Sequence, residues 1–364
     1  MPEWTAFHRR LVLVGPHSLL EWLLWVLLLP LGMLYGLASW LRLLGYRSGV
    51  WQRYRAPVPV IAVGNLAVGG TGKTPVVDYL TSGLLAAGYR VAIVSRGYGG
   101  NSPRPVTLVS RGSGPLLSAK QCGDEPYLLA QRNPAALVAV GVRRRDVVRL
   151  VVEELHAEVI VLDDGFQHHA VARDLDLLLL DARQPFTNGW PLPAGLLREF
   201  PAAVKRADAV IFTRCDDLSS PVDVGRLPSY HCRYQLAERI RMLSGEDRPF
   251  ADIVGRNVVA FAGIAGPERF FQQLKAAGVK LLATFAFPDH VDYTDELQQR
   301  LIAAADGADF LVTTEKDAVK LPRTFPVPCY QVRLELEFLD QFPPLDRVLK
   351  LLKEDRYGAE KRIT

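Results

Sequence analysis

Short apolar runs alternate with longer amphipathic stretches from residue 58 to about residue 216. Apolar runs bounded by turn residues predict buried strands of a parallel sheet, and the stretches between them predict helices. The predicted strands are residues 58–63, 89–95, 137–140, 158–162, 175–181 and 209–213, and the predicted helices are 75–87, 127–131 and one that ends near 156. This alternation predicts an α/β fold with a doubly wound parallel sheet.

Beyond residue 219 the pattern loosens, and Pro221, Pro228 and Pro249 are typical of a linker. A smaller α/β unit follows, with predicted strands at 258–262, 281–287 and 310–313 and predicted helices at 267–277 and 294–305. Residues 101–118 are rich in Ser, Pro and Gly and predict an exposed excursion. The expected divisions are an N-terminal segment (1–56), a core that contains the parallel sheet (57–220), a linker (221–256), a C-terminal α/β domain (257–335) and a charged, helical tail (336–364).

The N-terminal segment contains twenty residues, Trp22 to Leu41, without a formal charge. That length is enough to cross the hydrocarbon core of a membrane, and tryptophans lie near its ends, as in interfacial aromatic belts. Two membrane structures fit the pattern: a transmembrane anchor, or a helix or hairpin in the interface that breaks at Pro30 and Gly32. An ordinary core helix is the third alternative.

The charge of the chain is concentrated at this end. Residues 1–56 hold six arginines against two glutamates, which gives +4 and accounts for the whole net charge of the 364 residues. Basic residues after an apolar segment are typical of contact with anionic lipid. These arginines are also the only feature of the sequence that would favour nucleic-acid binding, and contact with lipid already explains them. The four cysteines are scattered without a C-x-x-C pair, which argues against a disulfide framework or a zinc site and fits a reducing cytosol.

A glycine-rich turn joins the first predicted strand to its helix. It reads Gly69, Gly70, Thr71, Gly72, Lys73 and Thr74. A strand, such a turn and a helix start together predict a phosphate-binding P-loop, in which Lys73 reaches the β- and γ-phosphates and Thr74 binds Mg²⁺. Ala67 stands where the strict motif has its first glycine, so a βα turn without a nucleotide is the alternative.

The apolar run 158–162 ends in Asp163 and Asp164. P-loop enzymes place an Mg²⁺-binding carboxylate at the end of such a strand, and two aspartates there need partners. The sequence therefore predicts that Asp163, Asp164 or both hold Mg²⁺ together with Thr74.

Other polar residues follow the predicted strands, where ligands of open α/β sheets bind. Each also has an ordinary structural explanation as a solvated turn or as charge at a helix start. His290, between Asp289 and Asp292, is either an exposed loop residue or an oriented imidazole. The remaining candidates are Arg96, Tyr98, Asp124, Glu125, Arg144, Gln167, Arg198 and Glu199.

Taken together, these motifs resemble the lipid A 4′-kinase (tetraacyldisaccharide 4′-kinase) family. The resemblance runs in order over nearly the whole chain. Ala67 is consistent with it, because the loop of that family reads Gly-Asn-Leu followed by Gly-Gly-x-Gly-Lys-Thr. Its motifs are RAPVPV from Arg55, GNL from Gly64, GGTGKTP from Gly69, SRGYGG from Ser95, GDEP from Gly123, DDGFQH from Asp163, LPAG from Leu192 with LRE ending at Glu199, AGIAGPERF from Ala262, PDH from Pro288 and TTEKDAVK from Thr313.

The resemblance implies transfer of the γ-phosphoryl group of ATP to the 4′-hydroxyl of a tetraacyldisaccharide 1-phosphate. It implies Asp124 as the base for that hydroxyl with His290 as its partner, Lys73 and Asp164 as further catalytic residues, and the other candidates as contacts of the acceptor or ATP. It also implies an enzyme on the cytoplasmic face of the Gram-negative inner membrane, attached at the interface and needing ATP and Mg²⁺, a lipid acceptor and a membrane surface but no obligatory protein partner.

A second function class remains open, a membrane-tethered nucleotide switch or assembly ATPase without a small acceptor. GTPase switches usually carry Asn-Lys-x-Asp after a late strand, where this chain has Thr213-Arg214-Cys215-Asp216. No Asp-x-x-Gly begins at Asp163 or Asp164 either. Both observations favour the kinase.

Overall fold

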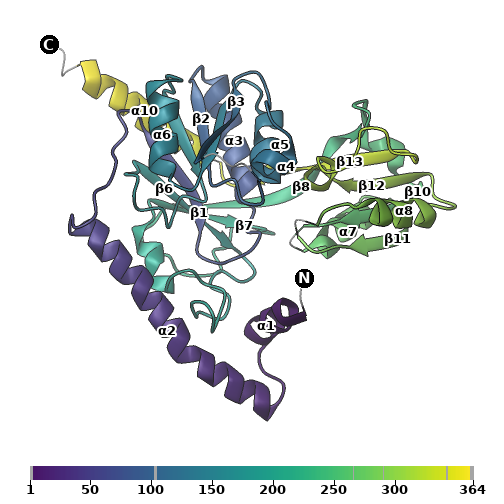
Figure 1. Ribbon diagram of the computed structural model, residues 1–364, viewed down its shortest axis with the longest axis horizontal. Helices are drawn as coiled ribbons and strands as arrows, with labels where there is room; N and C mark the ends of the chain where they lie inside the picture. The colour runs from purple at the N-terminus through teal and green to yellow at the C-terminus, as the bar shows by residue number, and fades with distance from the viewer. Residues whose placement is uncertain (1–2, 102–104, 265, 290, 342, 361–364) are drawn as a thin grey trace.

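The structure is a computed structural model that describes residues 3–101, 105–264, 266–289, 291–341 and 343–360. These residues form two lobes joined by a pair of long strands, with an N-terminal helix leaning against the larger lobe (Figure 1). The α/β class and the parallel sheet that the sequence predicts are confirmed.

The larger lobe is a parallel sheet covered on both faces. Its strand order is β7-β6-β1-β5-β2-β4, and β3 is added antiparallel to β4 at the edge. The strands are β1 (Val60–Asn65), β2 (Val91–Ser95), β3 (Val106–Arg111), β4 (Leu137–Gly141), β5 (Val159–Asp163), β6 (Leu175–Asp181) and β7 (Ala209–Thr213). The helices are α3 (Lys73–Ala86), α4 (Ala119–Cys122), α5 (Asp124–Arg132), α6 (Arg144–Glu153), the 3₁₀ turn η1 (Pro201–Arg206) and α10 (Pro344–Glu360).

Alternation along β1 explains the two layers of helices. Ile61 and Val63 pack with side chains of α3, α5 and α10 on one face, whereas Val60 and Ala62 pack with α6 on the other. All six residues of β1 are buried, which is expected for the middle strand of a parallel sheet. The P-loop is therefore held between a rigid central strand and a helix packed on the core.

Two segments of the larger lobe differ from the sequence prediction. The excursion predicted at 101–118 contains β3, whose Val109 is fully buried. The segment predicted as a tail, 336–364, begins with the last three residues of β13 (Cys329–Phe338) and continues into α10, whose Val348 and Leu352 are buried in the core beside α3. In both segments the structure depends on packing against residues that are distant in sequence. A local sequence pattern does not contain this information.

A pair of antiparallel strands joins the lobes. Strand β8 (Ser229–Met242) lies within the predicted linker, and β13 (Cys329–Phe338) returns beside it, with Tyr330 opposite Met242 and Phe338 opposite Cys232. Strand β8 also pairs with β7 in the larger lobe, and β13 pairs with β12 (Phe310–Thr314) in the smaller one. The described strands thus make one continuous sheet across both lobes.

The smaller lobe is a compact α/β unit close to the prediction. Its sheet continues from β13 in the order β12-β10-β11, all parallel. Its further elements are β9 (Asp247–Pro249), η2 (Phe250–Ile253), β10 (Asn257–Ala262), α7 (Pro267–Ala276), β11 (Lys280–Ala286), α8 (Asp295–Ala304) and α9 (Glu315–Ala318).

The N-terminal segment forms α1 (Glu3–Leu13) and one long helix, α2 (Leu19–Arg47). The predicted break at Pro30 is wrong, because the helix continues through the proline. One face of α2 lies on the loop before η1, where a Cβ on Gly36 would be 2.4 Å from the ring of Phe200, and the indole of Trp25 donates to the carbonyl oxygen of Ala194 at 3.0 Å.

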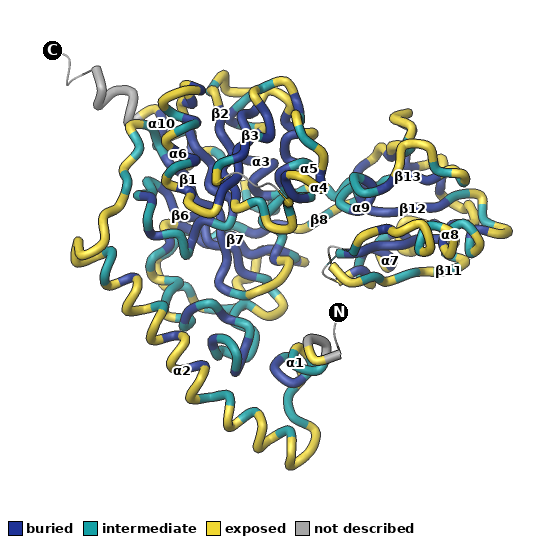
Figure 2. The backbone as a smooth tube through the Cα atoms, in the orientation of Figure 1, coloured by how far each residue is buried: buried dark blue, intermediate teal, exposed yellow. Residues whose placement is uncertain are grey.

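The rest of α2 is exposed (Figure 2). Its most apolar stretch is only 11% buried, and large side chains such as Trp22, Leu27, Leu34 and Trp40 are more than half exposed. A core helix would bury these side chains, so that alternative is wrong. By length and composition α2 could cross a membrane. Exposed apolar side chains along its whole length favour contact with lipid.

Candidate active site

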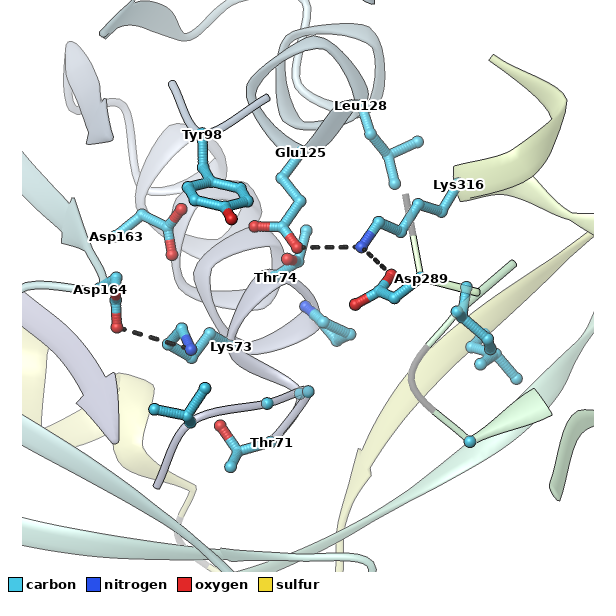
Figure 3. Close-up of a pocket in the computed structure, with 18 of the residues that line it drawn as sticks. Thr71, Lys73, Thr74, Tyr98, Glu125, Leu128, Asp163, Asp164, Asp289 and Lys316 are labelled. Carbon is cyan, nitrogen blue, oxygen red and sulfur yellow. Dashed lines mark hydrogen bonds and ion pairs between the residues drawn. The ribbon is translucent and has the colours of Figure 1, made fainter. Parts of the chain in front are cut away.

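A cavity of about 1440 Å³ lies between the lobes at the carboxyl ends of the parallel strands (Figure 3). The P-loop forms part of its wall together with Ser95, Glu125, Asp163 and Asp164 of the larger lobe. The smaller lobe contributes Asp289 and Lys316, and the N-terminal helices contribute Arg9, Tyr35, Ser39 and Arg42. Polar residues from all three parts of the chain therefore face one space.

The P-loop is braced by side chains from outside it. Arg214 donates to the carbonyl oxygen of Gly70 at 2.7 Å, Thr213 to that of Thr71 at 3.2 Å, and Tyr234 to that of Gly72 at 3.3 Å. Gly72 has φ +83°, and a Cβ there would lie 1.6 Å from the Tyr234 hydroxyl. Only glycine fits this position, because both the backbone conformation and the close approach exclude a side chain.

Lys73 is the first residue of α3 and points back over the loop. Its Nζ lies 3.1 Å from Oδ1 of Asn65, at the end of β1, and 3.5 Å from a carboxylate oxygen of Asp164. The ammonium group is thus held at the centre of the cavity wall, beside the carboxylates that end β5 (Figure 3).

Asp163 is the last residue of β5 and is almost fully buried. Ser95 of β2 donates to its Oδ2 at 2.9 Å, while its buried Oδ1 makes no hydrogen bond to a described residue. Burial, together with the carboxylates of Glu125 and Asp164, raises the pKa of Asp163 to about 6. An acceptor oxygen left without a donor in such a place favours a cationic partner.

Asp164 has the opposite electrostatic environment. Burial opposes its ionisation, but Lys73 and Arg198 outweigh burial and lower its pKa to about 2. Nη1 of Arg198 lies 2.8 Å from both carboxylate oxygens, and Arg144 donates to the carbonyl oxygen of Asp164 at 3.0 Å. Asp164 has φ +54°, in the left-handed region that is uncommon for residues other than glycine and that occurs often at functional sites. It is therefore a fixed anion between two cations.

The other candidates in the larger lobe divide into two groups. Gln167 accepts from Arg198 at 3.4 Å and donates to the carbonyl oxygen of Asn65, and it lines the cavity with Arg96 and Tyr98. Glu199 also borders the cavity, but its buried carboxylate is bound by both terminal nitrogens of Arg206 at 2.6 and 3.0 Å. This pairing gives Glu199 a structural partner that the sequence pattern did not indicate.

Two lysines of the smaller lobe pair with carboxylates at the start of α5. Lys316 lies 3.3 Å from Glu125 of the larger lobe and 3.1 Å from Asp289 of its own lobe (Figure 3). Lys320 lies 2.9 Å from Asp124 and donates to the carbonyl oxygen of Val291. The two acidic residues that open α5 thus both reach across the cleft. His290 lies outside the described residues.

Side chains that could hold a metal ion are few. Within the described ranges no three His, Cys, Asp or Glu side chains are grouped as a metal cage. This agrees with the way proteins hold Mg²⁺, through one or two carboxylates completed by water and substrate phosphates. Asp163, with its unpartnered Oδ1, and Thr74 on α3 are residues of the type required, and both line the same cavity.

Neither the two lysines nor the side chains that brace the P-loop were indicated by the sequence pattern. Lys316 and Lys320 occur in the motif TTEKDAVK, so their chemistry is visible, but nothing local indicates carboxylate partners almost two hundred residues away. Tyr234 and Arg214 carry no motif. Only the strand pairing that carries β8 past the P-loop reveals their position.

Comparison with known proteins identifies relatives of the whole chain. Residues 24–353 match the family model described as tetraacyldisaccharide-1-P 4′-kinase. A tetraacyldisaccharide 4′-kinase of Syntrophotalea carbinolica is 52% identical over 342 residues, which cover 93% of this chain and 96% of the relative. One of Pelobacter propionicus is 45% identical over 358 residues, covering 96% and 99%.

A solved structure resembles the chain as well. The "apo" form of LpxK from Aquifex aeolicus in complex with ATP superimposes with a TM-score of 0.76 at 33% sequence identity. The match covers 91% of this chain and 99% of that one.

Proposed function

Because the chain belongs to the tetraacyldisaccharide-1-P 4′-kinase family, we propose that it transfers the γ-phosphoryl group of ATP to the 4′-hydroxyl of a tetraacyldisaccharide 1-phosphate. The observation that carries the proposal is one cavity that is lined by a P-loop, two strand-end aspartates and residues of an exposed apolar helix. A nucleotide and a lipid head group can meet there.

The P-loop residues Gly69, Gly70, Thr71, Gly72, Lys73 and Thr74 bind the phosphates of ATP in this proposal. Lys73 neutralises charge on the transferred group, and the loop amides with the N-terminus of α3 add donors and partial positive charge. Asn65 and Asp164 keep the ammonium group in place before ATP arrives. Little free energy is then needed to order the Lys73 ammonium group during the reaction.

Mg²⁺ would be held by Thr74 and Asp163, with Asp164 beside them. When bound, the ion supplies positive charge to the phosphate oxygens as negative charge shifts toward the leaving group. The buried, unpartnered Oδ1 of Asp163 supports its role as a ligand. The ion pairs of Asp164 with Lys73 and Arg198 support a different role, the positioning of both cations around the transferred group.

Asp124 is the proposed base for the acceptor hydroxyl, with His290 as its partner. Asp124 begins α5 and pairs with Lys320 at 2.9 Å, and Lys320 also holds the carbonyl oxygen of Val291, next in the chain to His290. These contacts support a meeting of the two catalytic candidates across the cleft. Closure of the lobes would then complete the site and exclude water.

The acceptor would enter from the side of α2. Arg9, Tyr35, Ser39 and Arg42 of the N-terminal helices border the same cavity as the P-loop. In our proposal Arg96, Tyr98, Gln167 and Arg198 contact its sugars or phosphate, Arg144 and Glu125 position their charged neighbours, and Glu199 acts through Arg206. The acyl chains would remain in the membrane beside the exposed face of α2.

We further propose that the protein lies on the cytoplasmic face of the inner membrane, where ATP is available. The arginines 42, 47, 53 and 55 follow the apolar stretch and favour a negatively charged cytoplasmic leaflet. Packing of Gly36 and Trp25 against the larger lobe favours an α2 that lies in the interface over one that leaves the lobe to cross the bilayer.

A labelled-phosphate assay tests the function. Detergent-solubilised protein is incubated with γ-labelled ATP and tetraacyldisaccharide 1-phosphate, and label is expected in a bisphosphorylated lipid but not with Lys73→Ala. Slow ATP hydrolysis without labelled lipid would contradict the proposal and favour a nucleotide switch. Arg214 argues against a GTPase switch. It lies in the segment after β7 where GTPases carry their base-reading Asn-Lys-x-Asp motif, and here it donates to the carbonyl oxygen of Gly70 instead.

A further inference from the structure

The chain leaves the C-terminal end of α2 and turns back toward β1 (Figure 1). A second, smaller cavity of about 180 Å³ lies at this end of α2, because Leu43 and Arg47 line it. None of its residues lines the catalytic cavity. The cavity is lined by Leu43, Arg47, Arg53, Val171, Arg173, Asp176 and Arg206. Four of these seven residues are arginines, which is an unusual concentration of like charge around so small a space.

Two arginines form the inner wall. The side chains of Arg173 and Arg206 are each 9% exposed. Arg173 lies 2.9 Å from Asp176, and Arg206 binds Glu199 with its terminal nitrogens, while Nε of Arg206 makes no hydrogen bond to a described residue. The inner wall is therefore rigid, and it keeps a buried donor without a partner.

The other two arginines form the outer wall and are not neutralised. Arg47 and Arg53 are exposed, and neither forms an ion pair with a carboxylate in the described part of the chain. Even when Asp176 and Glu199 are both counted, four guanidinium groups share two carboxylates. Guanidinium groups bind phosphate oxygens in pairs of parallel hydrogen bonds, so the missing counter-charge fits a phosphate group.

The surroundings identify the source of the phosphate. Large apolar side chains close in sequence to the lining residues Leu43, Arg47 and Arg53 are exposed, namely Trp40, Leu44, Val50 and Trp51. In the interfacial placement proposed above, these side chains enter the lipid and bring Arg47 and Arg53 to the depth of the head groups. At about 30 Å³ for each water in the liquid, the cavity holds roughly six waters, which is enough space for a phosphate group.

We propose that this basic cavity binds the phosphate of an anionic glycerophospholipid and so fixes the end of α2 on the membrane. The proposal rests on the membrane attachment proposed above and not on the catalytic roles. It differs from diffuse attraction of basic residues to a charged surface, because it requires the two arginines of the outer wall together with the buried wall behind them.

Vesicle binding tests the proposal. The full-length protein is floated with vesicles of phosphatidylcholine alone or of an equimolar mixture with phosphatidylglycerol. We expect at least tenfold tighter binding to the mixed vesicles, and a loss of about tenfold for Arg47→Gln/Arg53→Gln. The conservative variant Arg47→Lys/Arg53→Lys keeps the charge but loses paired hydrogen bonds, so it should recover only part of the binding.

Arg55→Gln is the matched control. Arg55 is 72% exposed, lies two residues from Arg53 and pairs with Asp174 outside the cavity. Diffuse attraction predicts the same loss for Arg55→Gln as for Arg53→Gln, whereas a binding site predicts a clearly smaller loss. The proposal would be overturned if Arg55→Gln and Arg53→Gln lost vesicle binding equally. It would also be overturned if the wild-type protein bound vesicles with and without phosphatidylglycerol equally well.

Kinase assays in neutral detergent separate this proposal from the function. The outer-wall variants should phosphorylate the acceptor with unchanged kcat and KM, because the catalytic cavity does not include these residues. A raised acceptor KM together with unchanged vesicle binding would mean that the cavity holds the acceptor's own phosphate, and our proposal would be wrong. If the wild-type protein did not phosphorylate the acceptor at all, the proposed function would be refuted instead.

Discussion

Tyr234 lies on a strand that joins the two lobes, and its hydroxyl donates to the carbonyl oxygen of Gly72 in the P-loop at 3.3 Å. The phosphate-binding loop is thus in direct contact with the connection through which the smaller lobe must move. Burial raises the pKa of Tyr234 well above its usual range, so the hydroxyl keeps its proton and remains a donor.

Gly72→Ala should abolish useful ATP binding. The new Cβ would lie 1.6 Å from the Tyr234 hydroxyl and would require φ +83°, so the loop or β8 must shift. We expect ATP affinity to fall about 100-fold or more, measured by calorimetry. Tyr234→Phe removes one hydrogen bond, worth about 1 kcal/mol, and should change affinity less than tenfold. Wild-type affinity for Gly72→Ala would contradict this account of the loop.

Asp124→Asn should lose turnover and keep ATP affinity. Proton transfer by a positioned group contributes about 10² to 10⁴ in rate, and the amide cannot accept the hydroxyl proton. We therefore expect kcat to fall by at least 100-fold while the Kd for ATP stays within a few-fold. Asp306→Asn, on the exposed side of the smaller lobe, is the control. A near-normal kcat for Asp124→Asn would exclude Asp124 as the base.

The two aspartates that end β5 should differ in their response to Mg²⁺. Asp163 has a buried oxygen without a hydrogen-bond partner among the described residues, so Asp163→Asn should shift the Mg²⁺ dependence of the rate to roughly tenfold higher concentration. Asp164 is held by Lys73 and Arg198, so Asp164→Asn should lower kcat even at saturating Mg²⁺. A Mg²⁺ titration of both variants measures this, and the reverse pattern would exchange the assigned roles.

The bridge of Lys316 between Glu125 and Asp289 should couple the lobes. Hydrogen bonds to charged groups contribute about 1.5 to 3 kcal/mol, so Lys316→Met should lower kcat about tenfold. In a double-mutant cycle with Asp289→Asn the two losses should not add, and the coupling should be about 0.5 to 3 kcal/mol. Lys353→Met, on the exposed side of α10, is the control. Strictly additive losses would mean that the pair does not act as a unit.

Acid should destabilise the fold through two adjacent histidines. Burial, together with nearby arginines, lowers the pKa values of His168 and His169 to about 3, against about 6.5 in the unfolded chain. Between these values the unfolded chain binds more protons than the folded one, so stability falls as the pH drops below about 6.5. The double variant His168→Asn/His169→Asn should show a smaller decline in denaturation midpoint between pH 7 and pH 4.5, and an unchanged slope would contradict this assignment.

The elements that the sequence predicts well are those whose local pattern and long-range packing agree. The run 58–63 is apolar on both faces because β1 lies in the middle of the sheet, and the backbone conformation at Gly72 (φ +83°) already favours glycine before Tyr234 is considered. Strand β8 is different, since its residues Arg233, Gln235 and Glu238 are polar and only pairing with β7 and β13 makes it a strand. The P-loop and the strand-end aspartates could be predicted because their local patterns agree with the fold. The position of Tyr234 could not be predicted, because it depends on pairing between strands that are distant in sequence.

The return of the chain through β13 and α10 makes the smaller lobe an insertion within the larger one. The larger lobe uses residues from both sides of it, and Val348 and Leu352 complete the core beneath α3. Truncation after β8 would remove a core layer, whereas excision between Met242 and Tyr330, which face each other across the strand pair, would leave a hairpin and an intact core. The larger lobe, which contains the P-loop, is therefore discontinuous in sequence. The smaller lobe is a continuous insert that could be replaced by another insert of the same end-to-end spacing.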